Sequence, residues 1–561
     1  MADTSRSRSQ SLPSDDLTVN LLSRPTEDGH RTATCSPSVW LPKRARRWLP
    51  FAAVVCAVLL LLLQFGVPSS KSLYLERLKH LSTPTSPPPP FPTSDHAVQT
   101  QTERKPETVE QLYARQSRSL DEAVSRYTLR NGRRPPAHYD KWYQHAVENK
   151  CLIDDYDQIR RDFEPFYRLA DEDPERFQLM IDLGRILMMD DPKGMVTIRI
   201  EDGAVKLPSY TGSVFDSEWS DTLSRFSHIL PDMDFLINGR DEPRVVFNVH
   251  EPTVWKDALA LKDNIPFHNS PIPTSEFFKH RSGCSSFKDG SGTTVNALED
   301  VAFIRSASSA EFTTDLWPML SMTKISTCFS DIMFPGQYYY ESSAWSGKFS
   351  HPNDVPWEDK KDQIYWRGAS NGGHIYGDNY RQFSRFRLVK IAQNDSDLVD
   401  AKITGWYASH CTNDCERDPI IEEYNIGGAG SPREDVYNYK YLLDVDGNTF
   451  SGRYLGLLRS GSLVFKATAF AEYFNDWLRP YEHYVPVKID LSDLVEKVRW
   501  AIEHPVEARR IQEAGMEVAG RVITDRQNDC YFGAVLLEWA RLQGYARVGV
   551  PAEGERGAAD F

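Results

Sequence analysis

Positive charge is in short supply in this sequence. Lys and Arg number 65 against 79 Asp and Glu, and the formal net charge is −14 at pH 7. Proteins that hold nucleic acid through its phosphates need a strongly basic surface. This balance excludes nucleic acid as the main partner.

Cysteine is also scarce, with eight in 561 residues. Cys35 and Cys56 lie before or inside the apolar run described next, which leaves six later in the chain. An even number is compatible with disulfides in an oxidising compartment, and their pairing stays open. Cys411 and Cys415 are close enough in sequence to close a local loop. A zinc site would need four N or S ligands, and only His410 lies beside this pair, so we expect a disulfide and no metal there.

Long apolar runs are rare, and the segment 48–67 is the exception because it contains no charged residue. Its length suits a helix crossing a bilayer of ~30 Å. The basic cluster just before it predicts a cytosolic tail over 1–47 and a lumenal C-terminal part. The alternative is a cleaved signal peptide. Residues 68–116 are rich in Pro and polar residues, which is typical of an extended stem.

In the rest of the chain, apolar strand patterns such as 195–200 and 233–237 alternate with helical patterns such as those from about 379 to 393 and over 470–478, which predicts an α/β class. We expect an acceptor-side α/β domain over 117–357, a Rossmann-like nucleotide-binding domain over 358–505, and C-terminal helices with a tail over 506–561. The sequon Asn394-Asp395-Ser396 is a candidate N-glycosylation site.

The segment 439–467 is the most informative stretch. A strand over 439–443 is followed by the break Asp446-Gly447, a short helix carrying Arg453 near its start, and a second strand over 463–465. Free backbone N–H groups, the positive end of a helix dipole and a guanidinium together suit an anion such as a diphosphate. Similar units elsewhere often bind nothing, so other segments must support this interpretation.

Four segments of the chain resemble glycosyltransferase family 90, which contains fungal capsule-associated xylosyltransferases and animal protein O-glucosyltransferases. They are RRPPAHYDKWY (133–143), LPDMDFLINGRDEP (230–243), YWRGASNGG (365–373), and YKYLLDVDGNTFSGRYLGLLRSGSLVFKA with HYVPVKIDLSDL (439–467 and 483–494). The resemblance implies a GT-B-like fold, with two Rossmann-like domains facing a cleft. With the preceding segments, the expected fold class is α/β and GT-B-like, preceded by a single transmembrane helix and a Pro-rich stem.

The resemblance also implies roles for individual residues. Asp241 corresponds to the general base that deprotonates the acceptor hydroxyl, with Glu242 as its rival. Arg453 corresponds to the arginine that holds the donor diphosphate. Further donor-binding candidates are Arg367, Gly368, Asp446, Arg381 and Ser451. Asp444 and Asp446 look like the metal-binding D-x-D signature of another glycosyltransferase fold, but their place at a strand end favours a structural role, and we expect no metal and no other cofactor.

These expectations combine into an inverting, UDP-sugar-dependent glycosyltransferase acting on a glycan or glycoprotein. Xylose is favoured as the transferred sugar because the opening segment looks more like the fungal branch, and glucose is next. The expected setting is the Golgi membrane, with the bilayer contacted through 48–67 and the catalytic part in the lumen. A lumenal glycan-binding protein without turnover and a protein O-glucosyltransferase are the alternatives.

Overall fold

The computed structural model describes most of the chain after residue 105. The described residues are 106–174, 177, 195–207, 215–245, 247, 316–325, 329–343, 346–347, 355–373, 375, 377–411, 415–428 and 431–548. They include all the residues of the predicted site.

Four helices open the described part: α3 (Val109–Ala114), α4 (Leu120–Asn131), α5 (Tyr139–Glu148) and α6 (Asp157–Glu172). Thr108 begins α3 with a capping box, in which its side chain accepts from Gln111 N while the Gln111 side chain accepts from Thr108 N. Ser119 caps α4 in the same region by accepting from Glu122 N. Helix α3 lies within the segment expected to be stem.

A mixed five-stranded sheet follows, in the order β2-β1-β3-β4-β6. Its strands are β1 (Met195–Glu201), β2 (Ala204–Lys206), β3 (Met233–Asn238), β4 (Leu320–Ser321) and β6 (Ile332–Met333). Strand β1 is antiparallel to both β2 and β3, and the remaining pairs are parallel. The hairpin between β1 and β2 turns at Asp202 and Gly203, both with positive φ. The β1–β2 hairpin at the edge of the sheet and the antiparallel pairing of β1 with β3 differ from the mostly parallel sheet of a Rossmann-like domain, so the expectation of two Rossmann-like domains is wrong for this half.

The second sheet is entirely parallel, in the order β12-β10-β9-β7-β8. It consists of β7 (Lys361–Ala369), β8 (Val399–Gly405), β9 (Tyr439–Val445), β10 (Leu463–Ala467) and β12 (Val485–Pro486). In chain order this is the 2-1-3-4-5 arrangement of doubly wound folds. The order reverses between β7 and β9, and ligands of such sheets bind beyond the carboxyl ends of the strands at that point.

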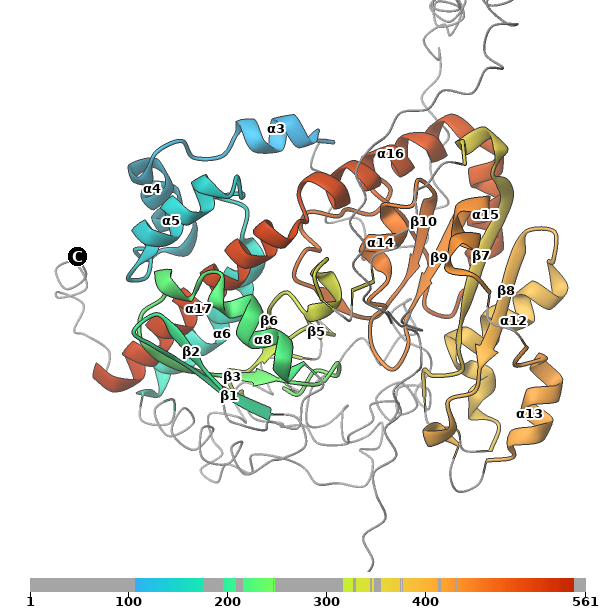
Figure 1. Ribbon diagram of the computed structural model, residues 1–561, viewed down its shortest axis with the longest axis horizontal. Helices are drawn as coiled ribbons and strands as arrows, with labels where there is room; N and C mark the ends of the chain where they lie inside the picture. Colours follow the sequence, from blue (N-terminus) through green and yellow to red (C-terminus); the bar gives the residue numbers. More distant parts are fainter. Residues whose placement is uncertain are drawn as a thin grey trace, which may run out of the picture. The chain divides into compact units, whose positions relative to one another are not determined.

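Helices pack around the parallel sheet as the crossover connections require (Figure 1). Helix α12 (Ser384–Asn394) contacts β8, α14 (Tyr454–Leu458) contacts β9 and β10, and α15 (Leu494–Glu503) contacts β7. Helix α16 (Pro505–Arg521) contacts β10, and α13 (Arg417–Tyr424) contacts α12. The remaining short elements are α8 (Asp216–Ser224), β5 (Thr323–Lys324), β11 (Ala471–Glu472), η2 (Ser227–Ile229), η5 (Gln337–Tyr339), η6 (Trp357–Asp359), η7 (Asn379–Gln382), η8 (Ala408–His410) and η9 (Arg433–Asn438).

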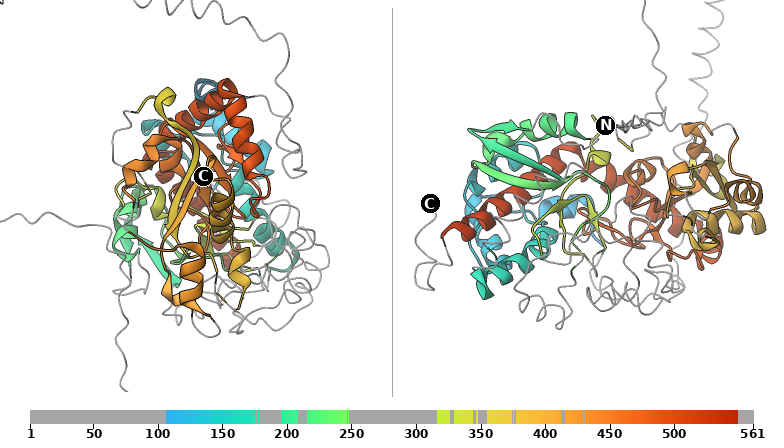
Figure 2. Two further views of the ribbon diagram at one scale, coloured as in Figure 1. Left: turned by 90° about the vertical axis from the view of Figure 1, so that its right-hand side faces the viewer. Right: turned by 90° about the horizontal axis from the view of Figure 1, so that it is seen from below.

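The last helix, α17 (Asp525–Val548), packs against α5, α6 and β3, which come much earlier in the chain. Figure 2 shows this red helix between the green strands and the blue-green helices. Trp539 Nε1 donates to the carbonyl of Asp234 at 2.8 Å. A disulfide joins Cys151 to Cys530 across a sequence separation of 379. The C-terminal helix therefore completes the core of the mixed-sheet half.

The predicted local disulfide between Cys411 and Cys415 is confirmed. One hydrophobic cluster runs through both halves and includes Phe235 of the mixed sheet and Val464 of the parallel sheet. The two sheets therefore share a continuous core.

The expected fold class needs a second correction, which concerns the membrane. Among the described residues no helix combines the length and the apolar character needed to cross a bilayer. The expected span, 48–67, lies outside the described ranges. The described fold is a mixed α/β fold with one parallel and one mixed sheet, without a transmembrane helix. The Golgi membrane setting and the lipid partner depended on that span and have no support here.

Candidate functional site

The carboxyl ends of β7 and β9 meet at the point where the parallel sheet reverses its order. Strand β7 ends at Ala369 with Arg367 and Gly368 just before it, and β9 ends at Val445. The two strands are hydrogen-bonded neighbours. The loops that leave these ends therefore lie where doubly wound folds bind their ligands.

The turn after β9 buries polar groups that have no protein partner. Gly447 N donates to Thr449 O at 2.7 Å and closes the turn. Asp446 is 6% exposed and accepts from Ala469 N at 2.8 Å through Oδ2, whereas its Oδ1 has no partner among the described residues. Ser451 Oγ, on a residue 5% exposed, also has none. Burial raises the pKa of Asp446 to about 7.

Arg453 follows this turn and precedes the first residue of α14. Its Nη1 donates to the carbonyl of Arg367 at 2.7 Å, so the side chain reaches from the β9 loop to the end of β7. Burial lowers the pKa of Arg453, and the Asp444 carboxylate opposes that shift. The arginine expected to hold the diphosphate thus lies at the switch point of the sheet.

Arg385, which the sequence analysis did not select, lies beside Arg453. It is 8% exposed and donates from Nε to Asp446 O and from Nη1 to Ala369 O, both at 2.9 Å, and also to the Asn371 side chain. Burial, followed by repulsion from Arg453, lowers the pKa of Arg385 to about 9. The Trp366 ring centroid is 5.4 Å from the Arg385 Cζ and 6.0 Å from the Arg453 Cζ.

Neither guanidinium forms an ion pair with a carboxylate of the described chain. Their nitrogens are held instead by backbone carbonyls and one amide, so two positive charges lie close together in a buried setting. An anion with two negatively charged groups would offset both the burial cost and the mutual repulsion.

The other donor-binding candidates are placed differently. Arg367 turns toward β8, where Nη2 is 2.6 Å from Asp400 Oδ1 and Nη1 donates to Asp400 O at 2.9 Å. Arg381 is in η7 and forms an ion pair with Glu423. Gly368 allows close packing, because a Cβ there would lie 2.5 Å from Trp366 Cζ2. The structure therefore brings together Arg453, Asp446 and Ser451, but directs the guanidinium groups of Arg367 and Arg381 to other carboxylates.

Asp241 lies in the loop that follows β3. Asn238 holds this loop by donating from Nδ2 to Glu242 O at 2.5 Å and accepting from Arg240 N at 3.1 Å. On the far side of Asp241, Asp331 accepts from Arg244 N at 2.8 Å and from Val245 N at 2.9 Å. The backbone is therefore pinned on both sides of the candidate base.

The carboxyl of Asp241 has the pKa that a general base needs near neutral pH. Burial is the main cause that raises this pKa to about 7, and the neighbouring Glu242 adds to it. A hydrogen bond from Tyr338 acts in the opposite direction. The Tyr338 hydroxyl lies 3.2 Å from Asp241 Oδ1 and 3.3 Å from Oδ2.

Tyr338 also touches the donor side. A Cβ at Gly452 would lie 2.6 Å from Tyr338 Cδ1, and the Phe450 ring meets the Tyr338 ring edge to face at 5.6 Å between centroids. One side chain therefore contacts both Asp241 and the loop that leads to Arg453.

The Asp444-Val445-Asp446 sequence does not present two free carboxylates. Asp444 is fully buried, and its Oδ2 lies 3.1 Å from the Lys466 ammonium, which also contacts Glu472 at 3.0 Å. This ion pair supports a structural role for Asp444. The expectation that no metal is required stays a prediction.

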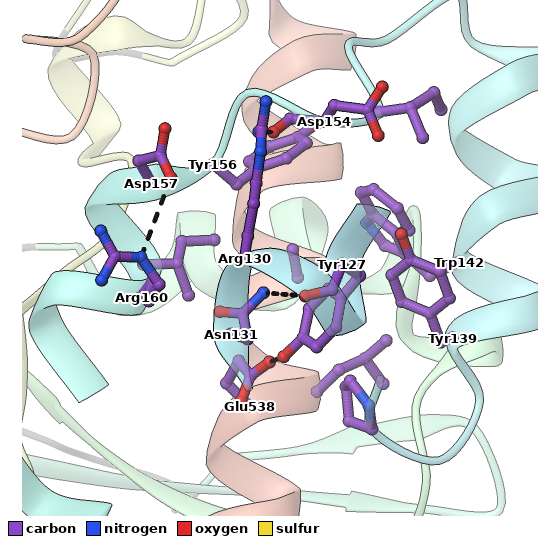
Figure 3. Close-up of a pocket in the computed structure, with 15 residues that line it drawn as sticks. Tyr127, Arg130, Asn131, Tyr139, Trp142, Asp154, Tyr156, Asp157, Arg160 and Glu538 are labelled. Carbon is purple, nitrogen blue, oxygen red and sulfur yellow. Dashed lines mark hydrogen bonds and ion pairs between the residues drawn. The ribbon is translucent and has the colours of Figure 1, made fainter. Parts of the chain in front are cut away.

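A separate pocket lies among the helices of the N-terminal half (Figure 3). Tyr127, Tyr139, Trp142 and Tyr156 line it, with Glu538 from α17. None of its lining residues belongs to the predicted site. Its polar groups are largely engaged with one another, as in the contact between Tyr127 and Glu538 that Figure 3 marks.

Comparison with known proteins finds a match over the segment that contains the parallel sheet. The model of glycosyl transferase family 90 matches residues 295–556. This segment of the chain is similar to glycosyl transferase family 90. The family 90 segment contains β7, β9, Arg385 and Arg453, whereas Asp241 precedes it.

Curated relatives also match the chain over part of its length. Protein O-glucosyltransferase 3 of Rattus norvegicus is 32% identical over 188 residues, which are 33% of this chain and 33% of the relative. Protein O-glucosyltransferase 2 of Danio rerio is 31% identical over 189 residues, 33% of this chain and 34% of the relative. Protein O-glucosyltransferase 1 of Rattus norvegicus is 27% identical over 248 residues, 41% of this chain and 58% of the relative. The matches thus span about a third to somewhat over half of these relatives' length.

Proposed function

We propose that this protein is an inverting glycosyltransferase that moves a sugar from a UDP-sugar to a hydroxyl group of a glycan or glycoprotein. The observation that carries the proposal is a pair of arginines, the buried Arg385 and the partly buried Arg453. They lie at the switch point of the parallel sheet without an acidic partner in the described chain. The match of residues 295–556 to the model of glycosyl transferase family 90 supports the same chemistry.

In the proposed reaction Asp241 accepts the proton of the acceptor hydroxyl as its oxygen attacks the anomeric carbon. The bond between that carbon and the phosphate oxygen breaks, and the nucleoside diphosphate leaves with the bonding electrons. Arg385 and Arg453 stabilise the negative charge that develops on the leaving group. The proton, the electron pair and the leaving group are all accounted for without a further reactant.

The donor side has features that suit a nucleotide-sugar. Asp446 Oδ1 and Ser451 Oγ are buried acceptors without a partner in the described chain, and a ribose or sugar hydroxyl would satisfy them. Arg367 and Gly368 contribute through the backbone, since the Arg367 carbonyl orients Arg453. Arg381, held by Glu423, is the weakest of the expected contacts.

Glucose and xylose are the two donors to compare. The names of the matched relatives favour glucose. The likeness of residues 133–143 to the fungal branch favours xylose. Two disulfides in the described chain favour an oxidising compartment, so we propose a lumenal setting in the secretory pathway.

The test is a donor panel with the full chain. Purified protein is offered UDP-glucose, UDP-xylose, UDP-galactose and UDP-N-acetylglucosamine with simple glycoside and glycopeptide acceptors, and UDP release and the anomeric configuration of the product are measured. We expect transfer from one donor with inversion, unchanged by a chelator. Binding of a donor or glycan without turnover would replace this proposal by the glycan-binding alternative, and loss of activity on chelation would contradict the metal-free reaction.

A further inference from the structure

The Tyr338 side chain contacts both Asp241 and the loop over 446–453 that leads from β9 to α14, which we call the donor loop. It belongs to η5, which comes from neither the Asp241 loop nor the β9 loop. Its ring packs edge to face on Phe215 at 5.8 Å and on Phe450 at 5.6 Å between centroids. Its hydroxyl reaches both carboxylate oxygens of Asp241.

The backbone around Tyr338 leaves the ring little freedom. A Cβ at Gly336 would lie 2.4 Å from Met322 Sδ, so the segment packs tightly on the mixed-sheet half. The neighbouring side chain of Gln337 is 1% exposed. The Tyr338 carbonyl accepts from Gly347 N at 3.1 Å, and Gly347 itself packs against Gly452 O. The phenol is therefore held in place from both halves.

The charged and polar groups around Asp241 indicate what the Tyr338 hydroxyl does. Glu242 faces Asp241 from the same loop and disfavours its charged form, and burial adds to this effect. From another element, Tyr338 faces Asp241. Burial raises the pKa of Tyr338, and Asp241, Glu242 and Tyr407, which precedes η8, add to this effect. Among these groups the Tyr338 hydroxyl is the one that stabilises the Asp241 carboxylate.

We propose that Tyr338 is a positioning residue that orients the Asp241 carboxylate toward the acceptor hydroxyl and fixes it relative to the donor loop. It acts through Asp241 and the Phe450–Gly452 segment rather than on the reacting atoms. This inference rests on the proposed function and adds a residue to it. Neither the resemblance nor the matched relatives selected this position.

The direct test is Tyr338→Phe, which keeps the ring and removes the hydroxyl. We expect the acidic limb of the kcat/KM profile to move to higher pH by about one unit, since the carboxylate loses a stabilising donor. Donor affinity, measured by calorimetry with UDP, stays unchanged because the ring contacts with Phe450 and Gly452 are kept. Tyr340→Phe is the matched control, because its ring lies on Arg225 instead, and its profile stays that of the natural protein.

A second variant strengthens the same hydrogen bond instead of removing it. Replacing Tyr338 by 3,5-difluorotyrosine makes the phenol a stronger donor at nearly constant shape, and moves the acidic limb to lower pH. An acidic limb that stays in place in both variants overturns the inference. If the natural protein transfers no sugar from any donor, the proposed function is wrong. If the enzyme is active but its pH profile is the same in the natural protein and in both variants, only the role of Tyr338 is wrong.

Discussion

The mixed sheet and the parallel sheet present opposite kinds of group to the same place. The mixed sheet offers Asp241, an acid whose pKa is raised to about 7 chiefly by burial. The parallel sheet offers Arg385 and Arg453, two bases whose pKa values are lowered chiefly by burial. In both halves uncharged groups, rather than an opposite charge, contact the functional side chain. The Tyr338 hydroxyl contacts Asp241, whereas backbone carbonyls and the Asn371 side chain contact the arginines. In the proposed reaction, proton transfer and charge neutralisation are therefore divided between the two halves.

The largest effect is expected from the mixed-sheet half. Asp241→Asn removes the proton acceptor and should lower kcat by about 10²- to 10⁴-fold, the usual contribution of a general base. Donor binding should be kept, because the arginines are untouched. Asp232→Asn, at the exposed other end of β3, is the control. If Glu242→Gln abolishes transfer and Asp241→Asn does not, the base has been assigned to the wrong carboxyl.

Substitutions in the parallel-sheet half are expected to weaken donor binding. Arg453→Ala and Arg385→Ala each remove a charged hydrogen-bond donor, worth about 1.5–3 kcal/mol, and should weaken UDP binding about 10- to 100-fold in calorimetry. Acceptor KM should change little. Arg499→Ala serves as the control, because that side chain is exposed on α15 and lies 3.5 Å from Asp395. A larger loss of acceptor affinity than of donor affinity would reverse the division between the halves.

The pH dependence of kcat/KM also tests which half supplies the base. A base must be ionised to act, so kcat/KM should fall about tenfold per unit as the pH drops below about 7, and level off above it. Asp446 also has its pKa raised to about 7, so Asp446→Asn separates the two carboxyls. If the acidic limb disappears in that variant, it belongs to the donor side and not to Asp241.

The smallest effect is expected from the support of the Asp241 loop. Asp331→Asn exchanges one acceptor oxygen for an N–H donor, so one of the bonds from Arg244 N, Val245 N or the Ser321 hydroxyl is lost. We expect a several-fold lower kcat with unchanged UDP affinity, because the loop loosens while the parallel sheet is untouched. A loss of UDP affinity would indicate that the halves are not independent.

Local patterns predicted the parallel sheet well. The strand, turn and helix around Arg453 appear as β9, its turn and α14, because apolar alternation and the Asp446-Gly447 break are local signals. Arg385 was missed because one helix was expected from about Asn379 to Gln393. The structure breaks it at Phe383, whose ψ of 136° is extended, and so separates Arg381 in η7 from Arg385 in α12.

Non-local pairing explains the errors. The alternating segments 195–200 and 233–237 were correctly expected as strands, but nothing in them indicated that they pair antiparallel. The helix expected over 470–478 is wrong, because Ala471 and Glu472 pair with β5 instead. Phe470, Phe474 and Trp477 imitate a helical spacing, yet tertiary packing buries them outside a helix. Asp241 came from the resemblance alone, since an Asp in a turn has no local mark of catalysis.

The disulfide between Cys151 and Cys530 joins two segments that are synthesised at different times. The first cysteine emerges 379 residues before its partner, roughly 20 to 75 s earlier at ~5–20 residues per second. During that interval the half that carries Asp241 still lacks α17, so the apolar surface that α17 covers is not yet buried by it. The half that carries Asp241 is therefore begun first and finished last, after the parallel sheet has been synthesised.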